Sequence, residues 1–232
     1  MRFLRHLLPL LLVTATGSFA AEVKYSQEFL KKVQEAVTDY ETGKLDDAMK
    51  AIDDAEKIKP GVPDVLNLRG AIFFDQGKYD DATKWFKQAL KRDPKFLASR
   101  INLADIDFRK GSYETARDSY NSILVDSPKN ELLLYRVFLT YLLQKDDKNA
   151  QTALDAIPFP GDTPAHYFAN GAWEYAHGHP QEASSYFNPG LSIFSVERCK
   201  PFIEPLVFLG WIKPGASATP SPAFPSPTAP PL

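Results

Sequence analysis

The sequence has a single cysteine, nearly balanced positive and negative charges, and no long hydrophobic run. Cys199 is the only cysteine among 232 residues, so no internal disulfide can form and packing must hold the fold. The net charge of −2 gives no electrostatic footprint for nucleic acid or for a membrane surface. No apolar run approaches the roughly 20 residues that a membrane-spanning helix needs.

Patterns that carry catalysis are also missing. The sequence contains no Gly-rich phosphate loop, nucleophile elbow or HExxH motif. His177 and His179 flank Gly178 without a third ligand at a suitable spacing, which favours a solvated turn over a metal site. Cys199 has no base spaced to activate it, which favours a small apolar residue over a reactive thiol. We therefore predict a protein that is not an enzyme and uses no cofactor or metal.

The two ends of the chain differ in composition from its centre. Residues 1–20 have a basic start, a short apolar stretch and small residues at the end, as in an export signal. Cleavage would leave Ala21 first in an exported chain, periplasmic or secreted, without a membrane span; retention as an uncleaved anchor is the alternative. Residues 213–232 are rich in proline and predict a disordered, extended tail. A docking peptide for a proline-binding module is the alternative for this tail.

Between these ends, small residues recur at intervals of 34. Gly77, Ala82 and Pro94 are preceded by Gly43, Ala48 and Pro60, and they are followed by Gly111, Ala116 and Pro128. A fixed period of this length is typical of stacked helix–turn–helix units. We expect five such units, covering residues 29–62, 63–95, 97–130, 131–157 and a fifth from Thr163 onward.

The residues within each unit have physical reasons for their positions. Gly70 and Ala82 are small because two helices are expected to cross there, with Phe86 filling the space around the contact. Carboxylate pairs recur at the starts of second helices, at 46–47, 80–81 and 146–147. Their recurrence indicates helix capping, because a general acid–base pair would occur once.

Three places depart from the pattern. In the fourth unit Phe138 and Lys145 replace a small residue and the turn glycine, so we expect a looser hairpin with a short second helix. Residues 188–190, Asn-Pro-Gly, are expected to interrupt or kink the second helix of the fifth unit. A closing helix is expected over about 195–212, starting near Pro201 or bending there.

With this period and these residues, the stretch resembles the tetratricopeptide repeat family. The resemblance covers about residues 29–187. It implies an all-α fold over residues 21–212: a right-handed solenoid of about five helix–turn–helix repeats with a C-terminal capping helix. It also implies a non-enzymatic protein–protein interaction scaffold whose first helices line a concave, apolar groove for a partner polypeptide.

The resemblance assigns groove positions one by one. They are Tyr40, Asn67, Phe74, Asp105, Phe108, Arg109, Tyr135, Leu142, Phe168 and Tyr175. One column of apolar side chains runs through Tyr40, Phe74, Phe108, Leu142 and Tyr175. This column would grip a peptide if it were exposed, or it would pack between repeats if it were buried. Val33 and Val37 stand where a clamp for a partner's C-terminal carboxylate needs a base and an amide, which excludes that mode.

Two other functions are compatible with the sequence. The protein could be a structural component of a larger envelope or secretion assembly, held through its convex face or its Pro-rich tail. It could also carry a small apolar ligand in its fourth and fifth repeats. The sequence names neither the partner nor the oligomeric state.

Overall fold

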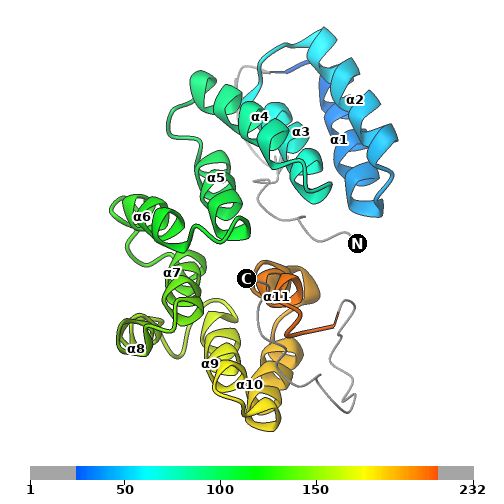
Figure 1. Ribbon diagram of the computed structural model, residues 1–232. Coiled ribbons are helices and arrows are strands. Elements are labelled where there is room, and N and C mark those ends of the chain that lie inside the picture. Colours follow the sequence, from blue (N-terminus) through cyan, green and yellow to red (C-terminus); the bar gives the residue numbers. More distant parts are fainter. Residues whose placement is uncertain (1–24, 214–232) are drawn as a thin grey trace, which may run out of the picture. The chain divides into compact units, whose positions relative to one another are not determined.

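The computed structural model describes residues 25–213, and within this range the chain forms α-helices and connecting turns without any strand (Figure 1). The helices of this range are α1 (Gln27–Thr42), α2 (Leu45–Ile58), α3 (Pro63–Asp75), α4 (Tyr79–Arg92), α5 (Leu97–Arg109), α6 (Tyr113–Leu124), α7 (Glu131–Leu143), α8 (Asp147–Asp155), α9 (Ala165–Ala176), α10 (Pro180–Ile193) and α11 (Val196–Phe208). The predicted all-α class is confirmed. The predicted signal at 1–20 and the tail from residue 214 onward lie outside the described residues.

The described residues divide into two compact units, and the division falls between Ile106 and Asp107 inside α5. The first unit holds α1 to α4 and most of α5, and the second holds the end of α5 and α6 to α11. In the first unit α1 pairs with α2 and α3 with α4; in the second, α7 pairs with α8 and α9 with α10. Four of the expected hairpins are thus confirmed, and the division falls within the first helix of the expected third repeat, 97–130.

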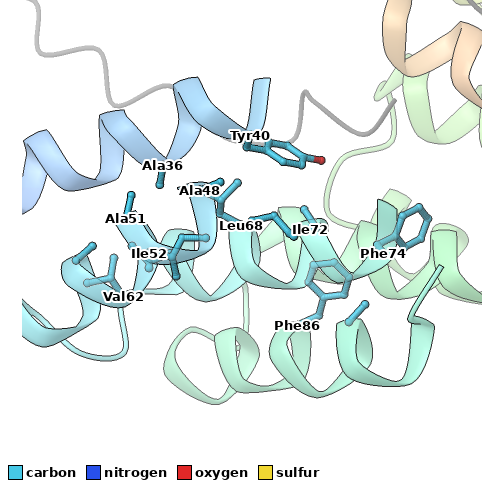
Figure 2. Close-up of a cluster of buried hydrophobic side chains, with 14 of the residues drawn as sticks. Ala36, Tyr40, Ala48, Ala51, Ile52, Val62, Leu68, Ile72, Phe74 and Phe86 are labelled. Carbon is cyan, nitrogen blue, oxygen red and sulfur yellow. The ribbon is translucent and has the colours of Figure 1, made fainter. Parts of the chain in front are cut away.

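The core of the first unit lies where helices of these hairpins cross. Side chains from α1, α2, α3 and α4 meet in one buried cluster (Figure 2). Ala48 and Ala82 are fully buried in it, as the close-approach argument predicts. A Cβ atom built on Gly70 would lie only 2.5 Å from Cε1 of Phe86, so the aromatic ring rests on the bare backbone of α3. The absence of a side chain at Gly70 is therefore what lets α3 and α4 approach.

The second unit repeats this contact between α9 and α10. Phe187 of α10 occupies the space that a Cβ atom on Gly171 of α9 would need. Phe168 stacks on the same Phe187 ring with the centroids 5.7 Å apart. Ala183, the counterpart of Ala82, is fully buried. The second and fifth sequence repeats therefore pack their two helices in the same way, with a phenylalanine ring on a glycine.

The fourth hairpin has the departures that its sequence predicts. Helix α8 is short, at nine residues. Lys145 occupies the turn with φ of 58°, a left-handed conformation that Gly43 adopts at φ of 74° in the first hairpin. Asp146 caps α8 by accepting a hydrogen bond from the backbone N–H of Asn149 at 3.2 Å. The side-chain hydrogen bond from Asn149 Nδ2, followed by this backbone bond, lowers the pKa of Asp146. The capping interpretation is confirmed for Asp146, whereas the pairs at 46–47 and 80–81 lie in the first turns of α2 and α4 without a side-chain cap hydrogen bond.

For the C-terminal helices, an interruption at 188–190 and a helix start near Pro201 are wrong, while the alternatives, a kink at 188–190 and a bend at Pro201, stay predictions. Helix α10 continues through Pro189 to Ile193, so residues 188–190 do not interrupt it. Helix α11 begins at Val196 with Ser195 as its N-cap, five residues before Pro201, and contains both Pro201 and Pro205. Contacts with neighbouring helices hold these segments helical against the loss of hydrogen bonds at proline.

No helix among residues 25–213 combines the length and the apolarity required to cross a bilayer.

We predict that Gly70→Ala lowers the free energy of unfolding by about 1–3 kcal/mol through overpacking against Phe86. Helix propensity alone would change stability in the opposite direction, by about 1 kcal/mol. Urea unfolding followed by circular dichroism measures the difference. In a Phe86→Leu background the same glycine substitution should be neutral or stabilising, and an equal loss in both backgrounds would contradict the ring-on-backbone contact.

We predict that Lys145→Gly raises the free energy of unfolding by roughly 0.5–1 kcal/mol, because glycine adopts the left-handed conformation without the Cβ clash. Lys148→Gly, an exposed lysine inside the adjacent α8, is the matched control and should be neutral or destabilising. Thermal unfolding of the two variants in parallel gives the comparison. Loss of stability in both would show that Lys145 bears no strain.

Candidate functional site

The predicted groove residues lie on the first helices of the hairpins and divide between the two units. Tyr40, Asn67, Phe74 and Asp105 belong to the first unit, and Phe108, Arg109, Tyr135, Leu142, Phe168 and Tyr175 belong to the second. Nine of the ten are buried, and the Arg109 side chain is 14% exposed. Binding of a partner by these residues stays a prediction, but their surroundings are now defined.

The apolar column is buried rather than open. Tyr40, Phe74, Phe108, Leu142 and Tyr175 are each at most 4% exposed. Phe74 packs edge-on against Tyr79, 5.4 Å between ring centroids, and Phe108 packs the same way against Tyr113 at 5.5 Å. In the second and third repeats, the aromatic at this column position therefore forms a ring pair beside the turn. Of the two alternatives, packing within the repeats is the one the structure supports.

In the first unit two polar groove positions, Asn67 and Tyr40, form hydrogen bonds with side chains of neighbouring helices. Oδ1 of Asn67 accepts hydrogen bonds from Ser99 Oγ and from Asn102 Nδ2, both at 2.9 Å, and all three residues are buried between α3 and α5. The Tyr40 hydroxyl donates to Asp75 Oδ2 at 2.9 Å and ties the end of α1 to the end of α3. These contacts fix how the helices pack, and they occupy the groups that a ligand would otherwise meet.

In the second unit the groove positions contact helix α11. Arg109, at the end of α5, forms an ion pair with Glu204 of α11 at 2.8 Å, and its guanidinium lies 4.2 Å from the Phe208 ring centroid. The Glu204 side chain is only 8% exposed, so the pair is largely shielded from water. Sequence reasoning placed α11 as an end cap and missed this contact, although Glu204 is the single acid in the apolar run 202–208.

Three aromatic groove positions complete the contact with the same segment. The Tyr135 hydroxyl donates a hydrogen bond to the backbone carbonyl of Phe202 at 2.8 Å, and burial raises the Tyr135 pKa far above its ordinary value. The Phe202 ring lies 5.3 Å from Tyr135 and 6.3 Å from Phe168. Tyr175 stacks on Trp211, just beyond α11, at 5.3 Å. We call Arg109, Tyr135, Phe168 and Tyr175 the docking surface, because together they hold α11 and the turn after it.

The chemistry of this surface is that of recognition. It offers one guanidinium, two tyrosine hydroxyls and flat aromatic rings. Burial raises the pKa of the nearby Cys199 thiol to about 11, which keeps it protonated at neutral pH. Among residues 25–213, no three His, Cys, Asp or Glu side chains gather in a way that could hold a metal ion. His177 lies 3.4 Å from Asp147, whereas His179 pairs with Glu174 at 2.9 Å, so the two imidazoles face different carboxylates.

The arrangement of the hairpins defines a helical repeat protein. Residues 63–96 match the tetratricopeptide repeat family. The chain is 34% identical over 86 residues, 37% of its length, to the small glutamine-rich tetratricopeptide repeat-containing protein 2 of Mycosarcoma maydis. These matches show a tetratricopeptide repeat at residues 63–96 and a resemblance to a repeat-containing relative over 86 residues. The chain spans only 24% of that relative, so the likeness concerns the repeats.

Solved structures share the fold. A tetratricopeptide repeat protein from Parabacteroides merdae aligns with a TM-score of 0.54 and 20% identity, covering 80% of this chain and 75% of that one. MamA from Desulfovibrio magneticus aligns with a TM-score of 0.51 and 16% identity, covering 72% of this chain and 96% of that one. At these identities the likeness is one of architecture, and it agrees with a fold built from stacked helical hairpins.

We predict that Tyr135→Phe lowers the free energy of unfolding by about 1–3 kcal/mol, since the buried carbonyl of Phe202 loses its hydrogen-bond donor. Tyr141→Phe on the same helix is the control, because Tyr141 is only half-buried and its ring lies under the Arg117 guanidinium. Chemical unfolding of both variants measures the effect. Equal stabilities would mean that the Tyr135 hydroxyl does not hold α11.

Proposed function

We propose that the protein is a non-enzymatic scaffold that binds a partner polypeptide through the docking surface, on the first helices of the hairpins in its second unit. One observation supports this above others: the docking surface holds an α-helix by apolar, aromatic, hydrogen-bonding and ionic contacts together. A surface with this combination has the means to select a helix by its sequence, because rings provide affinity and the charge fixes the register. Tetratricopeptide repeats generally serve as scaffolds for protein–protein interaction, which agrees with this role.

The proposed location is the cell envelope, in the periplasm or outside the cell. It rests on the composition of residues 1–20, which have the basic, apolar and small-residue zones of an export signal. The single cysteine is compatible with this location, since no structural disulfide is needed and the thiol is buried.

The binding mode that we propose differs from a stripe of exposed aromatics. Because Phe74 and Phe108 are buried in ring pairs, replacing them by alanine would remove core packing and would test stability instead of binding. The residues to test are those that face α11, with Arg109 first, since its charge offers recognition and its side chain is not fully buried.

A photoreactive amino acid at Lys110, the exposed neighbour of Arg109, tests the proposal in cells that produce the protein. We predict a discrete protein adduct at this position, and little at Val125, an 81% exposed residue in the turn after α6 of the same unit. Arg109→Glu should reduce the Lys110 adduct.

Adducts of equal yield at both positions, or no protein adduct at Lys110, would contradict binding at the docking surface. A co-purified small apolar molecule in place of a protein adduct would favour the carrier function.

A further inference from the structure

Helix α11 covers the docking surface in a way that differs from the packing of a further repeat. It joins α10 through only Phe194 and Ser195 and then contacts α7 and α9 in addition to α10 (Figure 1). Its residues Phe202, Glu204 and Leu206 are buried, while Phe208 at its end is 44% exposed. The helix thus occupies the surface that the proposed function needs.

We propose that α11 is a displaceable internal ligand, and that the physiological partner contributes a helix of the same chemistry, with one carboxylate set among aromatic and aliphatic residues, which takes its place. This inference rests on the proposed function and adds the chemical class of the partner. Until such a helix arrives, α11 keeps the docking surface closed.

The charge on the docking surface specifies the partner. Arg109 is largely shielded and lies against the Phe208 ring, so an occupant without a carboxylate would not replace its ion pair with Glu204. Glu204 supplies the carboxylate in α11, and Phe202 and Phe208 lie on either side of it in the sequence. A competing helix must therefore match an acid flanked by apolar residues, and a basic or purely apolar helix would be rejected.

The composition of α11 makes it replaceable. Pro201 and Pro205 lie inside the helix and have no backbone N–H, so the carbonyls of Glu197 and Pro201 lack the usual bond from four residues on. A segment of this sequence is a poor helix by itself, and its helical state depends on the docked contacts. Elements of low intrinsic stability are the ones that open locally without global unfolding.

The short link to α10 counteracts this weakness. A tethered segment competes at an effective concentration in the millimolar range, so a free helix must bind well to displace it. A change that weakens α11 alone should therefore raise the apparent affinity for a helix added from outside, because more of the protein presents an open surface.

Cys199 provides a reporter for the position of α11. It is the only thiol of the chain, it lies on α11, and it is fully buried with its Sγ 3.5 Å from the carbonyl oxygen of Gly190. Burial raises its pKa to about 11, so in the docked state it should react slowly with thiol reagents at pH 8. Release of α11 exposes the thiol and restores ordinary reactivity.

The first experiment measures the rate of thiol modification in the full chain. We expect Glu204→Gln to accelerate the reaction about tenfold or more, because the ion pair that links α11 to Arg109 is lost. Glu197→Gln removes the same charge from the same helix closer to Cys199, at an exposed position, and should change the rate far less. Exchanging the pair, Arg109→Glu with Glu204→Arg, should return the rate toward that of the wild type. Rates that do not distinguish Glu204→Gln from Glu197→Gln would overturn the proposal.

The second experiment uses a synthetic peptide of residues 195–213 with serine in place of Cys199 as the probe. We expect it to bind the Glu204→Gln protein about tenfold more tightly than the wild type, and to bind poorly when the peptide itself carries glutamine at 204. Equal affinity for both proteins, or no dependence on the peptide's carboxylate, would overturn the proposal. Circular dichroism and the reactivity of the exchanged pair separate a loss of docking from a loss of fold.

The Lys110 photocrosslink separates this inference from the proposed function. If the inference holds, the Glu204→Gln protein captures more of the cellular partner than the wild type does. Equal capture by both proteins would contradict the proposed role of α11 as an internal ligand and would leave the proposed scaffold function unaffected. Absence of a protein adduct from both would remove the scaffold function itself.

Discussion

The structure depends on the close approach of paired helices, and that approach depends on what is absent at two glycines. Phe86 lies over Gly70, and Phe187 lies over Gly171, at distances that leave no room for a Cβ atom. Buried alanines such as Ala48, Ala82 and Ala183 extend the close contact along the hairpins. Because dispersion and burial both fall off quickly with separation, this geometry sets how much core each hairpin can form without a disulfide.

The same constraint explains why so much of the fold was predictable. Small residues at a fixed spacing leave a periodic trace in the sequence, and so do turns that need a left-handed residue. Even the fourth hairpin was foreseen as a departure, since Lys145 takes the left-handed position without the freedom of glycine and α8 is short. Interruption at 188–190 was predicted wrongly, because local propensity at Pro189 is overridden by the packing of α10 on α9.

The candidate site was less predictable for a different reason. A periodic column gives the spacing of Tyr40, Phe74 and Phe108 but not which side chains cover them. Tyr79 packs against Phe74 and Tyr113 against Phe108, and both tyrosines come from the following helices. The contact between Arg109 and Glu204 joins residues 95 positions apart and occurs once, so no repeat pattern reports it. Only the isolated acid in the apolar run 202–208 hinted that this segment meets a buried base.

The proposed exchange of helices rests on the contrast between two kinds of packing. The contacts at the crossing glycines and alanines are apolar, buried and built on close backbone approach. The contact of α11 with the docking surface instead includes a shielded ion pair and a helix weakened by two prolines. A buried ion pair contributes little net stability but penalises a wrong register. The two prolines weaken the helix and so lower the free energy needed to release α11. Selectivity combined with weak retention is the property expected of a surface that exchanges one helix for another.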